Sequence, residues 1–182
     1  ALPAAEAALE KGDANRLSLA VEGVPDVFVH RSTCNAYALR VEDSALLINL
    51  GDGSVLDALK ESGVRNVEWI LFTDHHREFS QGIGRVDRAQ TKIAAPKLEQ
   101  ELFETPVQFR KWRPTLGDKY TVHGASYVRP PANAIELDRL LDADDVFEWR
   151  GFKITCVSTP GTSPGGMRYL VERGGRTIAF TG

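Results

Sequence analysis

A short apolar segment followed at once by a dense group of polar side chains constrains this chain more than any other feature. Residues 69–72, Trp-Ile-Leu-Phe, have the length and composition of a buried strand. Four residues that can bind metal or transfer protons come directly after it: Asp74, His75, His76 and Glu78. In open α/β sheets, ligands bind beyond the carboxyl ends of the strands. The pattern therefore predicts a strand that ends in a functional site.

The rest of the chain contains strand and helix patterns in a particular order. Strands are expected at 17–21, 27–30, 35–41 and 45–50. A helix at 55–62 then leads to the strand at 69–73, and a strand at 92–95 precedes a helix at 97–104. Residues 135–141 fit no single type, and the last strands are expected at 146–149, 152–158, 167–172 and 177–181. This order predicts two packed sheets with helices outside, an α/β sandwich.

Length and composition predict one domain. The chain has 182 residues, 42% of them hydrophobic, which suffices for one core. We expect this domain at 17–182, after an N-terminal helical extension at 1–16 whose helix covers 4–11. Residues 107–133 are rich in proline and glycine, and we expect this excursion to cover one side of the site.

Charge and hydropathy exclude several partners. The net charge is −3 without a basic block, which argues against nucleic acid and anionic membrane surfaces. No apolar run approaches the roughly 18 residues of a membrane span. A small-molecule substrate is one candidate partner, beside a C-terminal fragment or a second copy of the chain. Cys34 and Cys156 form no CxxC pair and are expected as two buried free thiols. The sequence assigns no cellular compartment.

Local patterns in the right order resemble the metallo-β-lactamase fold superfamily. Residues 45–53 are similar to its strand that ends in Asp-x-Gly, and 73–82 to its Thr-His-x-His-x-Asp-His-x-x-Gly motif. Residues 158–165 are similar to its Thr-Pro-Gly-His-Thr-Pro-Gly loop, and 180–182 to the strand before its metal-bridging Asp. The resemblance covers 27–182. It implies an αβ/βα sandwich of two mixed β-sheets with outer helices, the second half being incomplete.

The same resemblance implies that most of the family's metal ligands are replaced. The first His of the motif is Asp74 here, the second is retained as His76, and the Asp is Glu78. The last His of the motif, the His of the Pro-Gly loop and the Asp of Asp-x-Gly correspond to Phe79, Thr162 and Asn49. A centre with two metal ions is therefore not expected.

Two alternatives remain open for the polar residues. In the first, Asp74, His76 and Glu78 hold one divalent ion of zinc, manganese or iron. His75 is then an alternative ligand, and Glu78 is either a ligand or the catalytic base. In the second, no metal is bound: Asp74 caps the next turn, His76 is a satisfied imidazole, and Glu78 pairs with a nearby charge.

Further polar residues have only structural roles in the second alternative. Asn49 and Thr162 are expected to hold their own turns through side-chain bonds to the backbone. His30 and His123 are expected at the surface or the rim of the site, because neither has a partner at ligand spacing.

The resemblance implies a hydrolase-like protein with a degenerate metal site, which is weakly active, altered in metal use or inactive. One alternative is a catalytically dead binding or scaffold domain. Another is a fragment that assembles with a C-terminal partner chain, or a chain that pairs with a second copy of itself. This alternative arises because Gly182 lies one residue before the position of the family's bridging Asp.

Overall fold

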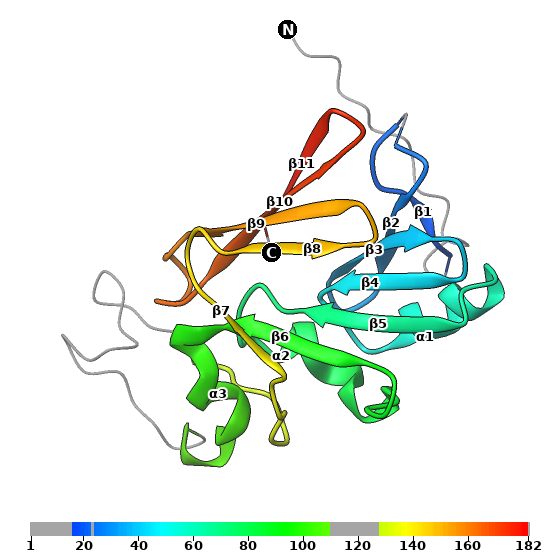
Figure 1. Cartoon of the computed structure of the whole chain (residues 1–182). Helices are drawn as coiled ribbons and strands as arrows, with labels where there is room; N and C mark the ends of the chain where they lie inside the picture. Colours follow the sequence, from blue (N-terminus) through cyan, green and yellow to red (C-terminus); the bar gives the residue numbers. More distant parts are fainter. Residues whose placement is uncertain (1–15, 23, 110–127, 182) are drawn as a thin grey trace, which may run out of the picture.

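In the computed structural model, residues 16–22, 24–109 and 128–181 are described. They form two β-sheets packed face to face, with helices on the far side of the larger sheet (Figure 1). The larger sheet has seven strands in the order β1 to β7, and the smaller has four in the order β11-β10-β9-β8. The expected N-terminal helix and His123 lie outside the described residues.

The seven-stranded sheet is antiparallel in one half and parallel in the other. Its strands are β1 (Ser18–Leu19), β2 (Val27–Arg31), β3 (Asn35–Val41), β4 (Ser44–Ile48), β5 (Asn66–Leu71), β6 (Lys92–Pro96) and β7 (Arg139–Leu141). Strands β1 to β4 pair antiparallel, and β4 to β7 pair parallel. Because parallel strands end at one edge, the residues that follow β5 and β6 meet there.

The four-stranded sheet pairs antiparallel in the described residues. Its strands are β8 (Val146–Trp149), β9 (Phe152–Ser158), β10 (Met167–Arg173) and β11 (Arg176–Phe180). The β8–β9 turn has positive φ at Arg150 and Gly151, and the β10–β11 turn at Gly174 and Gly175. Two such residues in a row make the tight hairpin turn that matches the twist of antiparallel strands.

Three helices and three 3₁₀ turns are the other regular elements of the described residues. The helices are α1 (Ser54–Glu61), α2 (Arg77–Ser80) and α3 (Gln100–Glu104). The 3₁₀ turns are η1 (Gln81–Arg85), η2 (Lys97–Glu99) and η3 (Pro106–Phe109). The helix expected at 97–104 is therefore split between η2 and α3. No helix in the described ranges has both the length and the apolar character needed to cross a bilayer.

Both faces of the larger sheet are buried, because each packs against a different layer. All five residues of β4 are buried. Leu46 and Ile48 belong to the core between the sheets, together with Phe152 and Ile154 of β9. Leu47 belongs to the second core, between the sheet and the helices. A continuous apolar run, rather than an alternating one, is what a strand covered on both faces requires.

Polar contacts fasten the smaller sheet to β5 and to the two residues that follow it. The backbone N–H of Met167 donates to the carbonyl of Thr73 at 2.9 Å. The hydroxyl of the fully buried Tyr169 donates to the carbonyl of Phe72 at 2.6 Å. The indole N–H of Trp149 donates to Glu68 at 2.7 Å. The two layers are thus bonded to each other along the strand that leads to the predicted site.

Candidate functional site

The site begins where β5 ends, and Asn49 fixes that end. The backbone N–H of Thr73 donates to Asn49 Oδ1 at 3.1 Å, and Asn49 Nδ2 donates to Thr73 Oγ1 at 3.1 Å. Asn49 has a positive φ of 60°, which asparagine tolerates better than most residues. It was expected to hold its own turn. Instead its amide bonds to Thr73, because the parallel β4–β5 pairing brings the ends of the two strands side by side.

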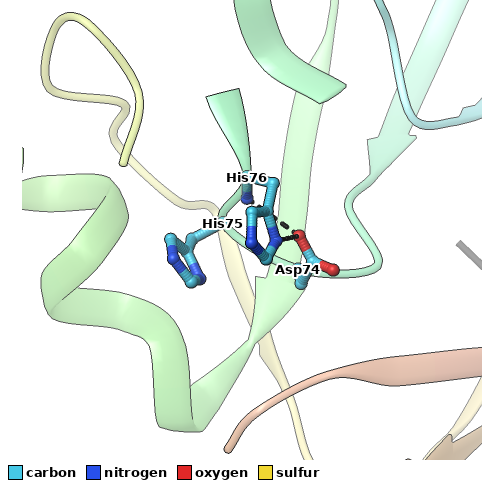
Figure 2. A group of neighbouring side chains, drawn as sticks. All are labelled: Asp74, His75 and His76. Carbon is cyan, nitrogen blue, oxygen red and sulfur yellow. Dashed lines mark hydrogen bonds and ion pairs between the residues drawn. The ribbon is translucent and has the colours of Figure 1, made fainter. Parts of the chain in front are cut away.

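Asp74 and His76 form a hydrogen-bonded pair. Asp74 Oδ1 accepts the backbone N–H of His76 at 2.8 Å and lies 2.7 Å from its ring Nδ1 (Figure 2). The expected cap by Asp74 is therefore present. Because a carboxylate oxygen accepts, Nδ1 carries the proton and Nε2 is the ring nitrogen that remains for other partners.

The pair also sets the proton affinity of His76. Burial disfavours the charged imidazolium, but the hydrogen bond and negative charge of Asp74 outweigh it, with further help from Glu99 and Glu78. The pKa of His76 is consequently raised above its ordinary value of 6.5. A histidine with this partner is a stronger base than a free one.

His75 is committed to structural bonds at both ring nitrogens. Its backbone N–H and its Nδ1 lie 2.6 and 3.0 Å from Glu99 Oε2. Its Nε2 accepts the backbone N–H of Arg129 at 3.3 Å. Its ring lies beside that of His76, with centroids 4.7 Å apart, and only His76 is bonded to Asp74 (Figure 2).

Glu99 is the residue that sequence reasoning missed. It follows β6, is 1% exposed, and also accepts the hydroxyl proton of Ser163 through Oε1. It thereby joins the segment after β5 to the loop before β10. The hydropathy pattern gave no signal, because its neighbour Leu98 is 66% exposed while the charged residue is buried. The only usable signal was its position beyond a parallel strand that neighbours β5.

Glu78 forms the charge pair that the second alternative predicted. Arg129 Nη1 lies 3.0 Å from Glu78 Oε1. Glu78 Oε2 is buried and has no hydrogen-bond partner among the described residues. The hydrogen bond from its own backbone N–H, and then that from Arg129, lower the pKa of Glu78 despite partial burial.

A pocket of about 420 Å³ lies beside these residues. It is lined by Thr33, Cys34, Asp74, His76, Glu78, Phe79, Thr162 and Thr181. The structure thus brings together five of the seven residues singled out in the sequence, and places the other two, His75 and Asn49, in buried positions outside this lining.

Two further sequence expectations can be compared with the structure. Cys156 is buried and Cys34 is half-buried, and neither forms a disulfide. Burial raises the pKa of the Cys34 thiol to about 12, so it stays protonated beside the pocket. The expectation that His30 lies at the surface is wrong. It is fully buried, and its Nε2 lies 2.8 Å from the hydroxyl of Ser54, because α1 begins over β2.

The donor atoms fit one divalent ion better than two. The described ranges contain one group of three metal-ligating side chains, Asp74, His75 and His76, whose donor atoms lie within 4.8 Å of one another. Both ring nitrogens of His75 are already in use. The donors left along the pocket are Asp74 Oδ2, His76 Nε2 and the unpartnered Glu78 Oε2. Phe79 and Thr162 offer no imidazole for a second ion.

Comparison with solved structures supports the fold, whereas the comparisons of sequence find no match. No protein-family model and no curated protein matches the chain. Solved structures do match. A metallo-β-lactamase from Cronobacter sakazakii, described by its HARLDQ motif, has a TM-score of 0.65 at 16% identity, over 86% of this chain and 59% of that chain.

Two further solved structures give the same result. MIM-1 from Novosphingobium pentaromativorans has a TM-score of 0.67 at 19% identity, over 86% of this chain and 58% of that chain. The subclass B3 enzyme BJP-1 of Bradyrhizobium japonicum has a TM-score of 0.63 at 15% identity, over 85% and 57%. The chain thus spans just under 60% of the length of these structures. The described part of the chain therefore has the metallo-β-lactamase fold.

Proposed function

We propose that this chain belongs to a hydrolase-like protein that holds a single divalent ion at Asp74, His76 and Glu78. The observation that carries the proposal is the pocket in which these three residues meet, with the buried and unpartnered Glu78 Oε2 among them. A buried carboxylate oxygen without a partner is costly, and a cation satisfies it. Two carboxylates and one imidazole suit zinc, manganese or iron.

The proposed site differs from the solved structures in its motif. The Cronobacter sakazakii protein is described by the sequence HARLDQ. The residues of this chain that resemble the family's motif, 74–79, read Asp-His-His-Arg-Glu-Phe. A difference at all six positions supports an altered use of metal. The substrate is proposed only as a small molecule, because one fold serves many reactions.

The residues at the pocket have separate roles in the proposed site. Asp74 holds Nδ1 of the His76 imidazole and thereby leaves Nε2 as the donor that would bind the ion. Phe79 lies edge-on to His76, with ring centroids 6.3 Å apart. A divalent ion would supply Lewis-acid chemistry by polarising a substrate oxygen.

Glu78 lies apart from the other two proposed ligands. Glu78 is not part of the group of donors within 4.8 Å, and its other oxygen is paired with Arg129 at 3.0 Å. Binding of an ion therefore has to draw Glu78 away from Arg129. This competition favours a second candidate function, a metal-free binding or scaffold domain, in which the Asp74–His76 and Glu78–Arg129 pairs are the final arrangement.

Metal analysis separates the two candidates. Protein purified without chelator is dialysed with zinc or manganese, and bound metal is counted per chain. The proposal predicts one ion, lost in His76→Ala and weakened at least tenfold in Glu78→Gln, because each variant removes a donor. Arg129→Gln is expected to bind metal more tightly, because Glu78 is then released.

Glu148→Gln is the matched control, because that glutamate is exposed on β8 and remote from the pocket lining. Circular dichroism verifies that each variant is folded. Absence of stoichiometric metal from the folded wild type between about pH 6 and 8, where the histidines and carboxylates are available as ligands, would contradict the proposal and support the binding domain.

A further inference from the structure

A second pocket lies on the other side of α2 from the candidate site. It has a volume of about 560 Å³, within the range of small-molecule sites. We call it the α2 pocket. Arg77 and Ser80 of α2 line it, whereas Glu78 and Phe79 of the same helix line the site pocket. The two pockets therefore share one short helix and have no lining residue in common.

Ser80 supplies an unused hydrogen-bonding group at the α2 pocket. The residue is 3% exposed, and its Oγ is buried without a hydrogen-bond partner in the described residues. A helical serine usually bonds to the carbonyl four residues earlier, and this one does not. Buried polar groups are otherwise satisfied in folded proteins, so an unpaired hydroxyl in a pocket wall points to a ligand.

Arg77 supplies a positive charge at the same pocket. Its Nε donates a long bond to the carbonyl of Pro130 at 3.4 Å, and no carboxylate of the described ranges pairs with it. The other arginine of the lining, Arg88, is neutralised by Asp138 at 2.9 Å. The exposed Glu136 adds one negative charge to the wall. This balance favours a singly charged anion over a doubly charged one.

The rest of the lining is largely apolar. Ile83, Ile93 and Ile135 contribute branched side chains, and Ile93 and Ile135 are buried. Apolar walls with a few placed polar groups are the usual composition of a site for a small organic ligand. We infer that the α2 pocket binds a small organic monocarboxylate with a compact apolar body, with the carboxylate at Arg77 and Ser80.

Titration with benzoate tests this inference, with chemical shifts of the backbone amides as the measurement. Benzoate is expected to bind saturably and to shift the amides of α2 and of residues 132–136. Arg77→Gln is expected to weaken binding about tenfold, because a charge-assisted bond is lost. Ser80→Ala is expected to weaken binding while leaving the protein at least as stable, because it removes an unsatisfied hydroxyl.

The controls distinguish this site from a plain cavity and from the candidate metal site. Arg85→Gln removes an arginine of η1 that pairs with Asp57 and does not line the α2 pocket, so it should bind benzoate normally. Benzoate binding should also persist in His76→Ala. Equal binding of benzyl alcohol, tighter binding of inorganic phosphate, or unchanged binding by Arg77→Gln would each overturn the inference.

Discussion

The carboxylate of Glu99 accepts hydrogen bonds from two segments that are far apart in the sequence. One oxygen receives the backbone N–H and the ring of His75, and the other receives the hydroxyl of Ser163. Ionised acceptors make the stronger class of hydrogen bond, and a buried one cannot turn to water if a partner is lost. At the scale of single residues, Glu99 therefore controls where His75 lies.

We expect Glu99→Gln to lower the free energy of unfolding by about 2 kcal/mol. Glutamine has the same size as glutamate, but its NH₂ group is a donor. It would therefore face either the donors of His75 or the hydroxyl of Ser163 without an acceptor between them. The measurement is urea unfolding at neutral pH. Glu148→Gln, an exposed substitution of the same kind, should change the stability by less than about 0.5 kcal/mol. An equal loss of unfolding free energy in both variants would show that the hydrogen bonds of Glu99 do not stabilise the fold.

At the scale of elements, a close approach of two glycines holds α2 and η1 in place. A Cβ added to Gly82 of η1 would lie 2.3 Å from the Cα of Gly53, which precedes α1 with φ of 86°. Phe79 accepts backbone N–H groups of Leu50 and Gly51 at 2.9 and 3.1 Å. The short α2 helix is therefore positioned by the turn after β4 rather than by its own length.

Two glycines of the same 3₁₀ turn make a matched test of this contact. Gly82→Ala is expected to destabilise the protein by about 3 kcal/mol, because backbone has to move to admit the methyl group. Gly84→Ala is expected to change stability by no more than about 1 kcal/mol, in the favourable direction. A Cβ on Gly84 would meet nothing within 4 Å. Thermal unfolding of the two variants gives the comparison, and similar melting temperatures would contradict it.

The elements themselves could largely be predicted from the sequence, because hydropathy and turn residues act locally. The strands at β3, β8 and β9 have the predicted bounds, and β5 begins three residues earlier than expected. Side-chain partners could not be predicted, because they depend on how distant strand ends meet. Asn49 bonds to Thr73 and Glu99 to Ser163 only through the sheet order, which local patterns do not encode.

At the scale of the whole molecule, Glu68 joins the two sheets at the end of β5 opposite the site. It accepts the indole N–H of Trp149 at 2.7 Å and pairs with Arg150 at 2.6 Å. The hydrogen bond from Arg150, ahead of the opposing effect of burial, lowers the pKa of Glu68 below its ordinary 4.5. The ionised carboxylate is therefore the form that favours the docked sheets.

A lowered pKa in the folded state fixes the sign of the pH dependence. The stabilisation from Glu68 is present above pH 4.5, the ordinary pKa, and is lost as the pH falls through the folded-state pKa. We expect Glu68→Gln to cost about 0.5–1 kcal/mol at pH 7, since the pair is partly exposed and screened. Urea unfolding at pH 7 and pH 3 should show the difference between wild type and variant shrinking at low pH. A difference that is the same at both values would exclude the ionised pair as its source.

The bond from the Tyr169 hydroxyl to the Phe72 carbonyl joins positions 97 residues apart. Closing so long a loop costs conformational entropy before the contacts between its ends have formed. This cost slows folding. Thr162, before β10, and Thr181, after β11, both line the pocket, and they reach their places only when the β10–β11 hairpin has docked. A nascent chain without β10 and β11 would carry Asp74 and His76 outside their final surroundings, so binding competence should emerge only after that hairpin has docked.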